Sequence, residues 1–511
     1  MAWRIILRNI GSNWAGYFVT AVIGFLLSPF VVHSLGTTGY GLWTLVLSLT
    51  GYFGLLDLGI RSSVGRFIAR YMALKDTANV NRMVSTAFVM LATAGALAMI
   101  ITVVLLEFAF GALHVEPQYQ HTAKLALLIA GLNMASILPL GVFSSVLVSL
   151  DRFDVLSGVT VIGELARGAL VVACLRQGYG LVGLAIVGLL ITVGEYGAMA
   201  LFAKSLHRPL RLSWSLVNRA TFQELFQFGL FRFVWIVGNQ LIFYSDSVVI
   251  GIFLGAGAIT SYAIAGSVIN YGRNVVSLLS DTLYPAASRM DAQRDSAGLQ
   301  RLLIDGTRMV LLVSLPLCVG FLFLGQQFIT LWMGKAYASS AIFLIVLTIP
   351  QFTAMPQYVS ALILGGMAKH KMLAYLIFLE GIANLILSII LIRKIGLIGV
   401  AWGTVIPDVI VTAIVVPLYT LRTLKLDVRE YLVKAWARPM ICALPMVAMG
   451  YVLSVVVKET SKGVFLAEVA ALCAVFGLMS FSLCLDSEQR AMTRRKVRGL
   501  VLRERVVIHE A

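Results

Sequence analysis

Charged residues are scarce in this chain of 511 residues. They make up 13% of the sequence, whereas hydrophobic residues make up 59%, and the mean hydropathy is +0.91. A water-exposed domain cannot bury such an excess of apolar side chains, so the composition excludes a soluble globular protein. The N-terminus lacks the short apolar core and cleavage site of a removable signal peptide, and the first apolar run, Trp14 to Val32, is long enough to cross a bilayer. We interpret that run as a retained membrane helix.

Cysteine is also rare, and the patterns of common catalytic sites are missing. The five cysteines lie within apolar runs without C-x-x-C spacing, and the six histidines are scattered. We therefore interpret the cysteines as packing residues and exclude a paired-cysteine redox or metal site. The sequence has no G-x-x-x-x-G-K-[ST] loop, H-E-x-x-H motif or G-x-S-x-G elbow. We expect neither an enzyme nor a bound cofactor.

The net charge of +16 would suggest a nucleic-acid partner in a soluble protein, but its distribution favours a role in membrane topology. We expect about fourteen spans of roughly twenty apolar residues. They begin near residues 13, 41, 84, 123, 155, 180, 223, 258, 308, 339, 373, 399, 439 and 464. The termini and every second connection hold roughly 30 of the 40 Lys and Arg residues. By the positive-inside rule these segments, including both termini, face the cytoplasm.

An internal repeat divides the chain. GLVGLA at 180–185 returns as GLIGVA at 396–401, and the same shift superimposes Glu164 on Glu380. LGTTGY at 35–40 is likewise echoed by LGAGAITSY at 254–262, and both are predicted to be glycine-rich turns between two helices. Repeated membrane architectures tend to place a substrate path between their halves, so the repeat favours transport.

The repeat also sets the predicted domains. The fold class is an all-α integral membrane protein with two pseudo-symmetric six-helix bundles and two additional C-terminal helices. The predicted divisions are an N-terminal bundle at 1–204, a cytoplasmic linker at 205–222, a C-terminal bundle at 223–425, two further spans at 426–485 and a basic cytoplasmic tail at 486–511. We interpret the tail as an anchor to anionic lipid.

Three arginines lie within predicted spans, where ionisable groups are costly unless they have a partner, a wet cavity or a function. They are Arg232, Arg273 and Arg167. A cavity lined by these guanidinium groups would suit a phosphate, because their planar donors form paired hydrogen bonds. The alternative is structural pairing, which is open above all for Arg167, because Glu164 lies three residues away on the same helical face.

Buried acids in the spans provide candidates for ion coupling. A membrane carboxylate can take up a proton or ligate sodium, or it can simply neutralise an arginine. The candidates are Asp246, Glu380, Asp408 and Glu195.

Two further features concern the ends and bends of spans. Asp57 and Arg61, four residues apart, are predicted to form a local ion pair at the cytoplasmic mouth, as a gate. Prolines near Gln351 and next to Asp408 are candidate hinges.

Several segments resemble a known family. RNIGSNWAGYFVTAVIGFLLSPFVVHSLGTTGYGLW at 8–43, GLLDLGIRSSVGRFIARY at 54–71, YSDSVVIGIFLGAGAITSYAIA at 244–265 and LYPAASRM at 283–290 are similar to the polysaccharide transporter branch of the multidrug/oligosaccharidyl-lipid/polysaccharide exporter superfamily. The resemblance implies two six-helix bundles in a V that open alternately to either side. It also implies flipping of a polyprenyl-pyrophosphate-linked oligosaccharide across the bacterial inner membrane.

The resemblance sets the expected partners and the alternatives. The partners are the lipid-linked glycan, membrane lipids, and the polymerase and glycosyltransferases of the same pathway, with no nucleic acid. The site residues would be Arg232, Arg273, Arg167 and Glu164 for substrate, with H⁺ or Na⁺ as the coupling ion. The main alternative is a cation-coupled multidrug exporter of the same fold, for which acids and aromatics should dominate the cavity. A membrane glycan polymerase or glycosyltransferase would need larger loops than this chain has, and a membrane scaffold would not explain buried charge in both halves.

Overall fold

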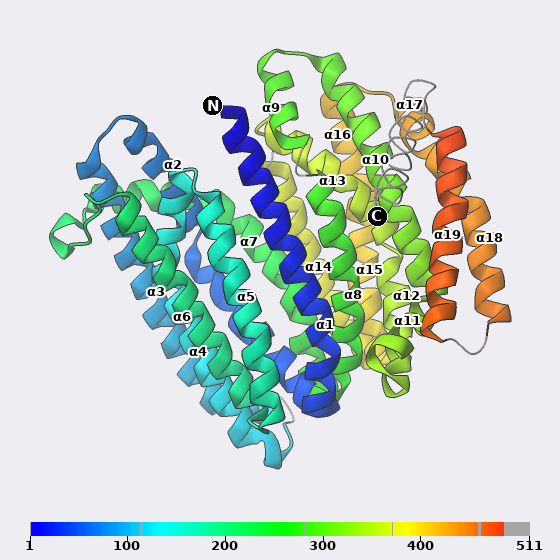
Figure 1. Ribbon diagram of the computed structural model, residues 1–511, viewed down its shortest axis with the longest axis horizontal. Helices are drawn as coiled ribbons and strands as arrows, with labels where there is room; N and C mark the ends of the chain where they lie inside the picture. Colours follow the sequence, from blue (N-terminus) through cyan, green and yellow to red (C-terminus); the bar gives the residue numbers. More distant parts are fainter. Residues whose placement is uncertain (1, 113–114, 281–282, 370, 458–460, 485–511) are drawn as a thin grey trace, which may run out of the picture. The chain divides into compact units, whose positions relative to one another are not determined.

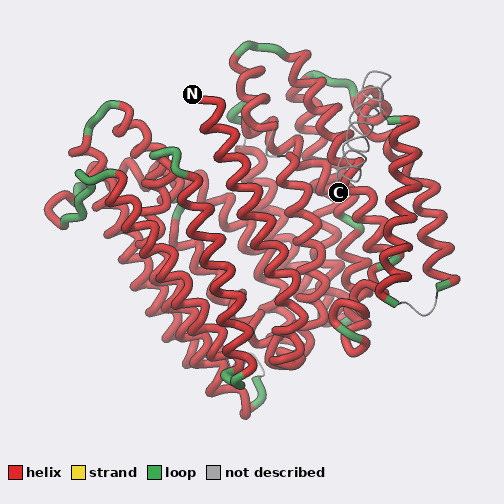
Figure 2. The backbone as a smooth tube through the Cα atoms, in the orientation of Figure 1, coloured by secondary structure: helices red, strands yellow, loops and turns green. Residues whose placement is uncertain are grey.

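The computed structural model describes residues 2–112, 115–280, 283–369, 371–457 and 461–484. Every regular element in these residues is helical and none is a strand, as Figure 2 shows. The prediction of an all-α membrane protein is confirmed. Apolar helices form here because a bilayer offers no hydrogen-bond partners, and a helix satisfies its backbone groups internally.

The elements follow one another as labelled in Figure 1. The first part of the chain contains α1 (Ala2–Gly51), η1 (Tyr52–Asp57), α2 (Ile60–Ala73), α3 (Thr77–Ala112), α4 (Pro117–Ser149), α5 (Phe153–Arg176), α6 (Gly180–Leu206), η2 (Trp214–Leu216), α7 (Arg219–Leu254), α8 (Ala256–Ser280) and α9 (Tyr284–Ala292). The second part contains α10 (Ser296–Phe323), α11 (Gly325–Met333), η4 (Lys335–Ser340), α12 (Ala341–Thr348), α13 (Gln351–Gly366), α14 (Lys371–Ile395), α15 (Leu397–Ile410), a π-helical turn (Val411–Val415), α16 (Val416–Leu424), α17 (Val428–Tyr431), a second π-helical turn (Leu432–Ala437), α18 (Arg438–Val456) and α19 (Lys462–Leu483).

The described residues contain eleven helices long and apolar enough to cross a membrane, or up to twelve if the bent pair Lys335–Thr348 and Gln351–Gly366 counts as one span. Fourteen spans were predicted, and the difference has two sources. The stretch Gly16–Asp57 is counted as one span, whereas two spans were predicted in this region. The helix α8 does not meet the same standard of hydropathy, because polar residues such as Asn270, Arg273 and Asn274 interrupt it.

The long helix α1 is broken at the predicted glycine-rich turn. Its 50 residues would extend about 75 Å at ~1.5 Å per residue, more than twice the ~30 Å of a hydrocarbon core. Gly36 interrupts the helix with a φ of 71° and a ψ of 177°, a conformation that glycine adopts without strain. The length and the break together support two crossings joined at residues 35–40.

The contacts group the chain into two compact units. Unit 1 comprises residues 1–267 and 371–407, and unit 2 comprises residues 268–370 and 408–511. Unit 1 includes the whole of α14 because this helix packs closely on α7. A methyl group added at Gly238 would lie 2.7 Å from the backbone carbon of Ile377, and one added at Gly381 would lie 2.9 Å from the Gly238 carbonyl oxygen. The two units are defined by contacts, whereas the predicted halves are defined by the sequence repeat. The boundaries of the predicted halves therefore remain a prediction.

Unit 1 has an apolar core formed mainly by α2, α3 and α4, which lie side by side with α5 and α6 in Figure 1. Val64, Val84, Leu91 and Val142 are fully buried in it. Lipid tails are as apolar as these side chains, so the helices are held together by close van der Waals packing.

Unit 2 is organised around α10, which contacts α13 and α18, while α18 packs on α19. Cys318, Cys442 and Cys484 are buried in its apolar clusters, which agrees with the packing role predicted for cysteine. Cys473 is exposed, so that interpretation does not extend to it. The predicted anchor at 486–511 lies outside the described residues.

Candidate functional site

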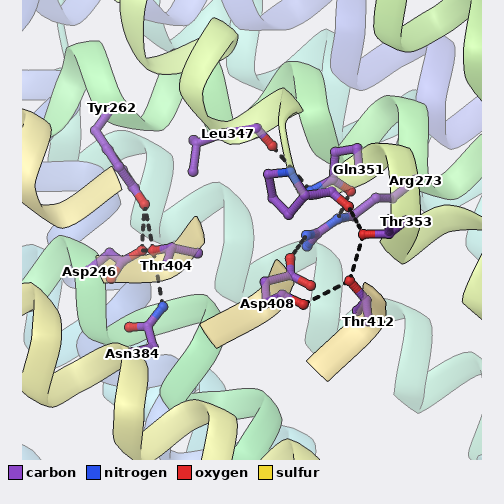
Figure 3. Close-up of polar contacts among 11 residues, drawn as sticks. Asp246, Tyr262, Arg273, Leu347, Gln351, Thr353, Asn384, Thr404, Asp408 and Thr412 are labelled. Carbon is purple, nitrogen blue, oxygen red and sulfur yellow. Dashed lines mark hydrogen bonds and ion pairs between the residues drawn. The ribbon is translucent and has the colours of Figure 1, made fainter. Parts of the chain in front are cut away.

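Asp246 on α7 lies among neutral oxygen-bearing side chains within unit 1. The residue is 5% exposed. Its Oδ2 accepts hydrogen bonds from the hydroxyl groups of Tyr262 on α8 at 2.5 Å and Thr404 on α15 at 2.9 Å, as Figure 3 shows. Its Oδ1 accepts a longer hydrogen bond from Ser388 on α14 at 3.4 Å. Four helices therefore supply the immediate surroundings of one buried carboxylate.

A second set of polar contacts supports these donors. Asn384 donates to Thr404 Oγ1 at 3.0 Å, and its amide oxygen accepts from Ser245 at 3.4 Å. Thr404 and Ser388 also lie 3.2 Å and 3.4 Å from the Val400 carbonyl oxygen. Buried polar groups need such partners because an unsatisfied one is costly. We call Ser245, Asp246, Tyr262, Asn384, Ser388 and Thr404 the Asp246 group.

The Asp246 group brings oxygen atoms together around a carboxylate. None of the ion pairs among the described residues involves Asp246. The surrounding hydroxyl, amide and carbonyl groups offer oxygen atoms, which hard cations prefer as ligands. A buried membrane carboxylate in such surroundings can take up a proton or ligate a cation.

Gly403 allows α14 and α15 to approach closely enough to build the group. A methyl group at this position would lie 2.4 Å from Ser388 Oγ and 2.6 Å from the Ser388 backbone nitrogen. Any larger residue would push α15 away from α14. Small residues are common where membrane helices meet in this way, and here the close approach brings Thr404 to Asp246.

Arg273 on α8 is paired with a carboxylate inside unit 2. Its Nη2 lies 3.3 Å from Asp408 Oδ2 on α15, and its Nε donates to Gln351 Oε1 on α13 at 2.8 Å, as Figure 3 shows. The side chains of Arg273 and Asp408 are 19% and 8% exposed. Asp408 is therefore a neutralising partner for Arg273, whereas the sequence did not decide whether Arg273 has one.

Backbone irregularities position the partners of Arg273. The α12–α13 pair bends by 49° around Pro350, which has no N–H to donate to the preceding helical turn. Gln351 follows this bend, and its side-chain amide donates to the Leu347 carbonyl oxygen at 3.2 Å. The π-helical turn Val411–Val415 follows Asp408, where Thr412 donates to the Asp408 carbonyl oxygen at 2.7 Å. A bend is therefore present before Gln351 and a π-helical turn after Asp408, whereas a hinge role at either place stays a prediction.

A third charged group lies between α5 and α6 in unit 1. Arg167 Nε lies 3.4 Å from Glu164 Oε1, and Arg167 Nη2 lies 4.0 Å from Glu195 Oε2. The predicted Glu164–Arg167 contact is confirmed. One guanidinium faces two carboxylates, so this arrangement favours the structural interpretation of Arg167 over a cation reserved for phosphate.

The predicted ion pair at the end of η1 is also confirmed. Arg61 Nε lies 3.4 Å from Asp57 Oδ1, and the Arg61 backbone N–H donates to the same oxygen at 3.2 Å. The Arg61 carbonyl oxygen accepts from Ser145 on α4 at 3.2 Å. These contacts tie α2 to η1 and α4, while a gating role for the pair stays a prediction.

Two further predicted site residues lie on α7 and α14. Arg232 lies on α7, but its side chain is outside the described residues. Glu380 lies on α14 and is partly buried. Their proposed roles stay predictions.

Sequence reasoning missed the neutral members of these groups. Tyr262, Asn384, Ser388 and Thr404 surround Asp246, but hydroxyl and amide side chains are common in membrane helices and carry no distinctive spacing. The GLIGVA repeat was a usable signal, because Thr404 follows it by three residues on a helix that approaches α14 closely.

Comparisons with known proteins agree with this architecture. The family model described as "Polysaccharide biosynthesis protein" matches residues 6–291. A protein of Shigella flexneri, named as an O-antigen transporter, is 22% identical over 409 residues, which cover 78% of this chain and 93% of that protein.

Solved structures show the same fold. The inward closed conformation of the lipid II flippase MurJ matches with a TM-score of 0.73 and 16% identity, over 93% of this chain and 98% of that one. An inward-facing multidrug resistance MATE family transporter of the MOP superfamily matches with a TM-score of 0.67 and 15% identity, over 80% of this chain and 94% of that one.

Proposed function

Because the chain belongs to the polysaccharide biosynthesis protein family, we propose that it moves a polyprenyl-pyrophosphate-linked oligosaccharide across a bacterial inner membrane by alternating access. The observation that carries the proposal is the family match, which covers more than half of the chain. The likeness to a protein named as an O-antigen transporter supports the same substrate class. The glycan would be a repeat unit of O-antigen, capsule or exopolysaccharide.

The described geometry supports a transporter over an enzyme. Charged groups are costly inside a bilayer and commonly mark an ion or substrate pathway. Such groups occur on α7 and on α8, each with neutral polar residues arranged around it. These contacts lie within helices long enough to belong to a membrane.

The Asp246 group is the proposed coupling site. Uptake of H⁺ or Na⁺ by its carboxylate would neutralise a buried negative charge, so occupancy would alter the packing preferences of α7, α8, α14 and α15. A ligand shifts a conformational equilibrium only by its difference in affinity for the two states. A carboxylate that forms no ion pair among the described residues would provide such a difference.

Expression in a strain that lacks its own O-antigen transporter tests the proposed function. The chain should restore surface glycan when it is supplied with a glycan it accepts, so several O-antigen and capsule backgrounds are needed. Accumulation of lipid-linked repeat units at the cytoplasmic face in every background, at normal membrane levels of the protein, would contradict the proposal.

The phosphate role of the arginines makes a separate prediction. Arg232→Gln combined with Arg273→Gln should lower glycan export at least tenfold, because each charge-assisted hydrogen bond to phosphate contributes about 1.5–3 kcal/mol. Export is measured as surface glycan at matched protein levels, with each single variant alongside. Arg301→Gln on the exposed surface of α10 is the control and should leave export unchanged. Normal export by the double variant would remove the arginines from substrate recognition.

A further inference from the structure

A pocket of about 810 Å³ opens within unit 1, away from the groups around Asp246 and Arg167. It lies where α3 begins, near the end of α4 and at the end of α6, and the link between α6 and η2 forms much of its wall. The lining residues are Ala78, Asn81, Phe143, Lys204, Arg208, Leu210, Arg211, Leu212, Ser213, Ser215 and Leu216. Its volume falls in the range of about 300–1,000 Å³ typical of ligand sites.

Side chains of α3 fix the backbone of this link. Asn81 donates to the Pro209 carbonyl oxygen and accepts from the Arg211 backbone N–H, both at 3.0 Å. Ser85 Oγ accepts from the Ser213 backbone N–H at 3.2 Å. The link has little regular secondary structure of its own, so these contacts hold its shape. The pocket wall is therefore organised before any ligand arrives, which lowers the cost of binding.

The pocket carries a concentrated positive charge. Lys204, Arg208 and Arg211 all line it, and all three are exposed. None of the ion pairs among the described residues uses any of the three side chains. The hydroxyl groups of Ser213 and Ser215, which lie 2.8 Å apart, add neutral hydrogen-bonding capacity. Two guanidinium groups, one ammonium group and two hydroxyls are suited to phosphate oxygens.

The pocket also lies at the level where a membrane meets water. Lys204 belongs to the last turn of α6, and Ala78 and Asn81 belong to the first turns of α3, so both spans end here. The adjoining Trp214 is 78% exposed and Leu212 is 45% exposed. Tryptophan is enriched at membrane interfaces, and an exposed leucine beside it suits contact with acyl chains. The ligand that fits this combination carries both a phosphate and an apolar body.

We propose that this pocket binds the phosphate-bearing headgroup of a membrane lipid. The phosphate would contact Arg208, Arg211 and Lys204, and the upper part of the acyl chains would contact Leu212 and Trp214. The site differs from the proposed coupling group in position and chemistry, and it goes beyond the proposed function because an anionic phospholipid could occupy it without being transported. The shared chemistry is a lipid phosphate, whose source is either phosphatidylglycerol or a polyprenyl pyrophosphate.

Fluorescence quenching by brominated lipids tests the proposal on the full-length protein in nanodiscs. Brominated phosphatidylglycerol should quench tryptophan emission more than brominated phosphatidylcholine does, and Trp214→Phe should remove most of this difference. Arg208→Gln combined with Arg211→Gln should raise the phosphatidylglycerol concentration needed for half quenching about tenfold or more. Arg219→Gln is the control, because Arg219, the first residue of α7, is an exposed cation outside the pocket, and it should change little.

Competition identifies the source of the phosphate. Displacement of brominated phosphatidylglycerol by undecaprenyl pyrophosphate at far lower concentration would support the proposal with the carrier lipid as ligand. Displacement only by excess phosphatidylglycerol would support it with an ordinary phospholipid. Equal quenching by both brominated lipids, no effect of the double arginine variant, or displacement by inorganic phosphate as effective as that by lipid would overturn it. Glycan export measured in parallel keeps this test separate, because failure of lipid binding with normal export leaves the proposed function standing.

Discussion

Replacing Asp408 with asparagine is expected to lower the free energy of unfolding by about 3–5 kcal/mol. The substitution removes the carboxylate that lies 3.3 Å from Arg273, whose guanidinium is 19% exposed. Removing one partner of a buried pair is costly because the remaining charge stays desolvated. Thermal unfolding of the purified protein in detergent, followed by the loss of its monodisperse elution, should show a clearly lower midpoint.

A double substitution separates the pair's structural role from any role in transport. Arg273→Gln together with Asp408→Asn removes both charges and should recover most of the lost stability, because neutral amides can still hydrogen bond. Asp305→Asn is the control. The Asp305 side chain is 66% exposed and lies 3.8 Å from Arg308, and a surface ion pair of this kind contributes at most about 1 kcal/mol. Equal midpoints for the Asp408 and Asp305 variants would show that the Arg273–Asp408 contact does not stabilise the protein.

Replacing Asp246 with asparagine is expected to reduce glycan export by at least tenfold while leaving stability unchanged or higher. Asparagine preserves the size of the side chain but cannot take up a proton or carry the charge that attracts a cation. It also removes a buried charge that has no ion-pair partner among the described residues, which relieves a desolvation cost. A coupling free energy of about 1–3 kcal/mol between ion and substrate corresponds to effects of roughly 5–150-fold.

The loss of export without a loss of stability makes the Asp246 test specific. A variant that merely unfolds would lose both export and thermal stability, whereas the coupling role predicts loss of export alone. Asp291→Asn, at an exposed position at the end of α9, should alter neither quantity. Thr404→Val should produce a smaller loss of export than the Asp246 variant, since it removes the hydroxyl that donates to Asp246 and accepts from Asn384 but leaves the carboxylate. Export at the wild-type level by the Asp246 variant would rule out the coupling site.

The sequence predicted the features that depend on local patterns. Apolar runs gave the membrane helices, and LGTTGY gave the break at Gly36. Spacing of three or four residues predicted the contacts of Arg167 with Glu164 and of Arg61 with Asp57, and both are present. Such contacts follow from helix geometry alone, because residues at this spacing share one face.

Contacts between distant helices could not be predicted in the same way. Arg273 and Asp408 are 135 positions apart, and only the tertiary fold brings their side chains together. For the same reason the hypothesis of a phosphate clamp treated Arg273 as an available cation, whereas the structure gives it a carboxylate partner. Sequence pattern reports which groups are costly to bury, but a folded arrangement is needed to identify their partners.

Flipping of a fluorescent polyprenyl-pyrophosphate-linked oligosaccharide in proteoliposomes is the most direct test of the central claim. The labelled lipid starts in one leaflet, a gradient of H⁺ or Na⁺ is imposed, and an impermeant quencher reports the fraction that has crossed. The account predicts that the wild-type protein moves the lipid faster with a gradient than without one, and that Asp246→Asn does not respond to the gradient. Unchanged distribution of the lipid, together with gradient-driven export of a cationic dye by the same proteoliposomes, would contradict it and favour the multidrug exporter.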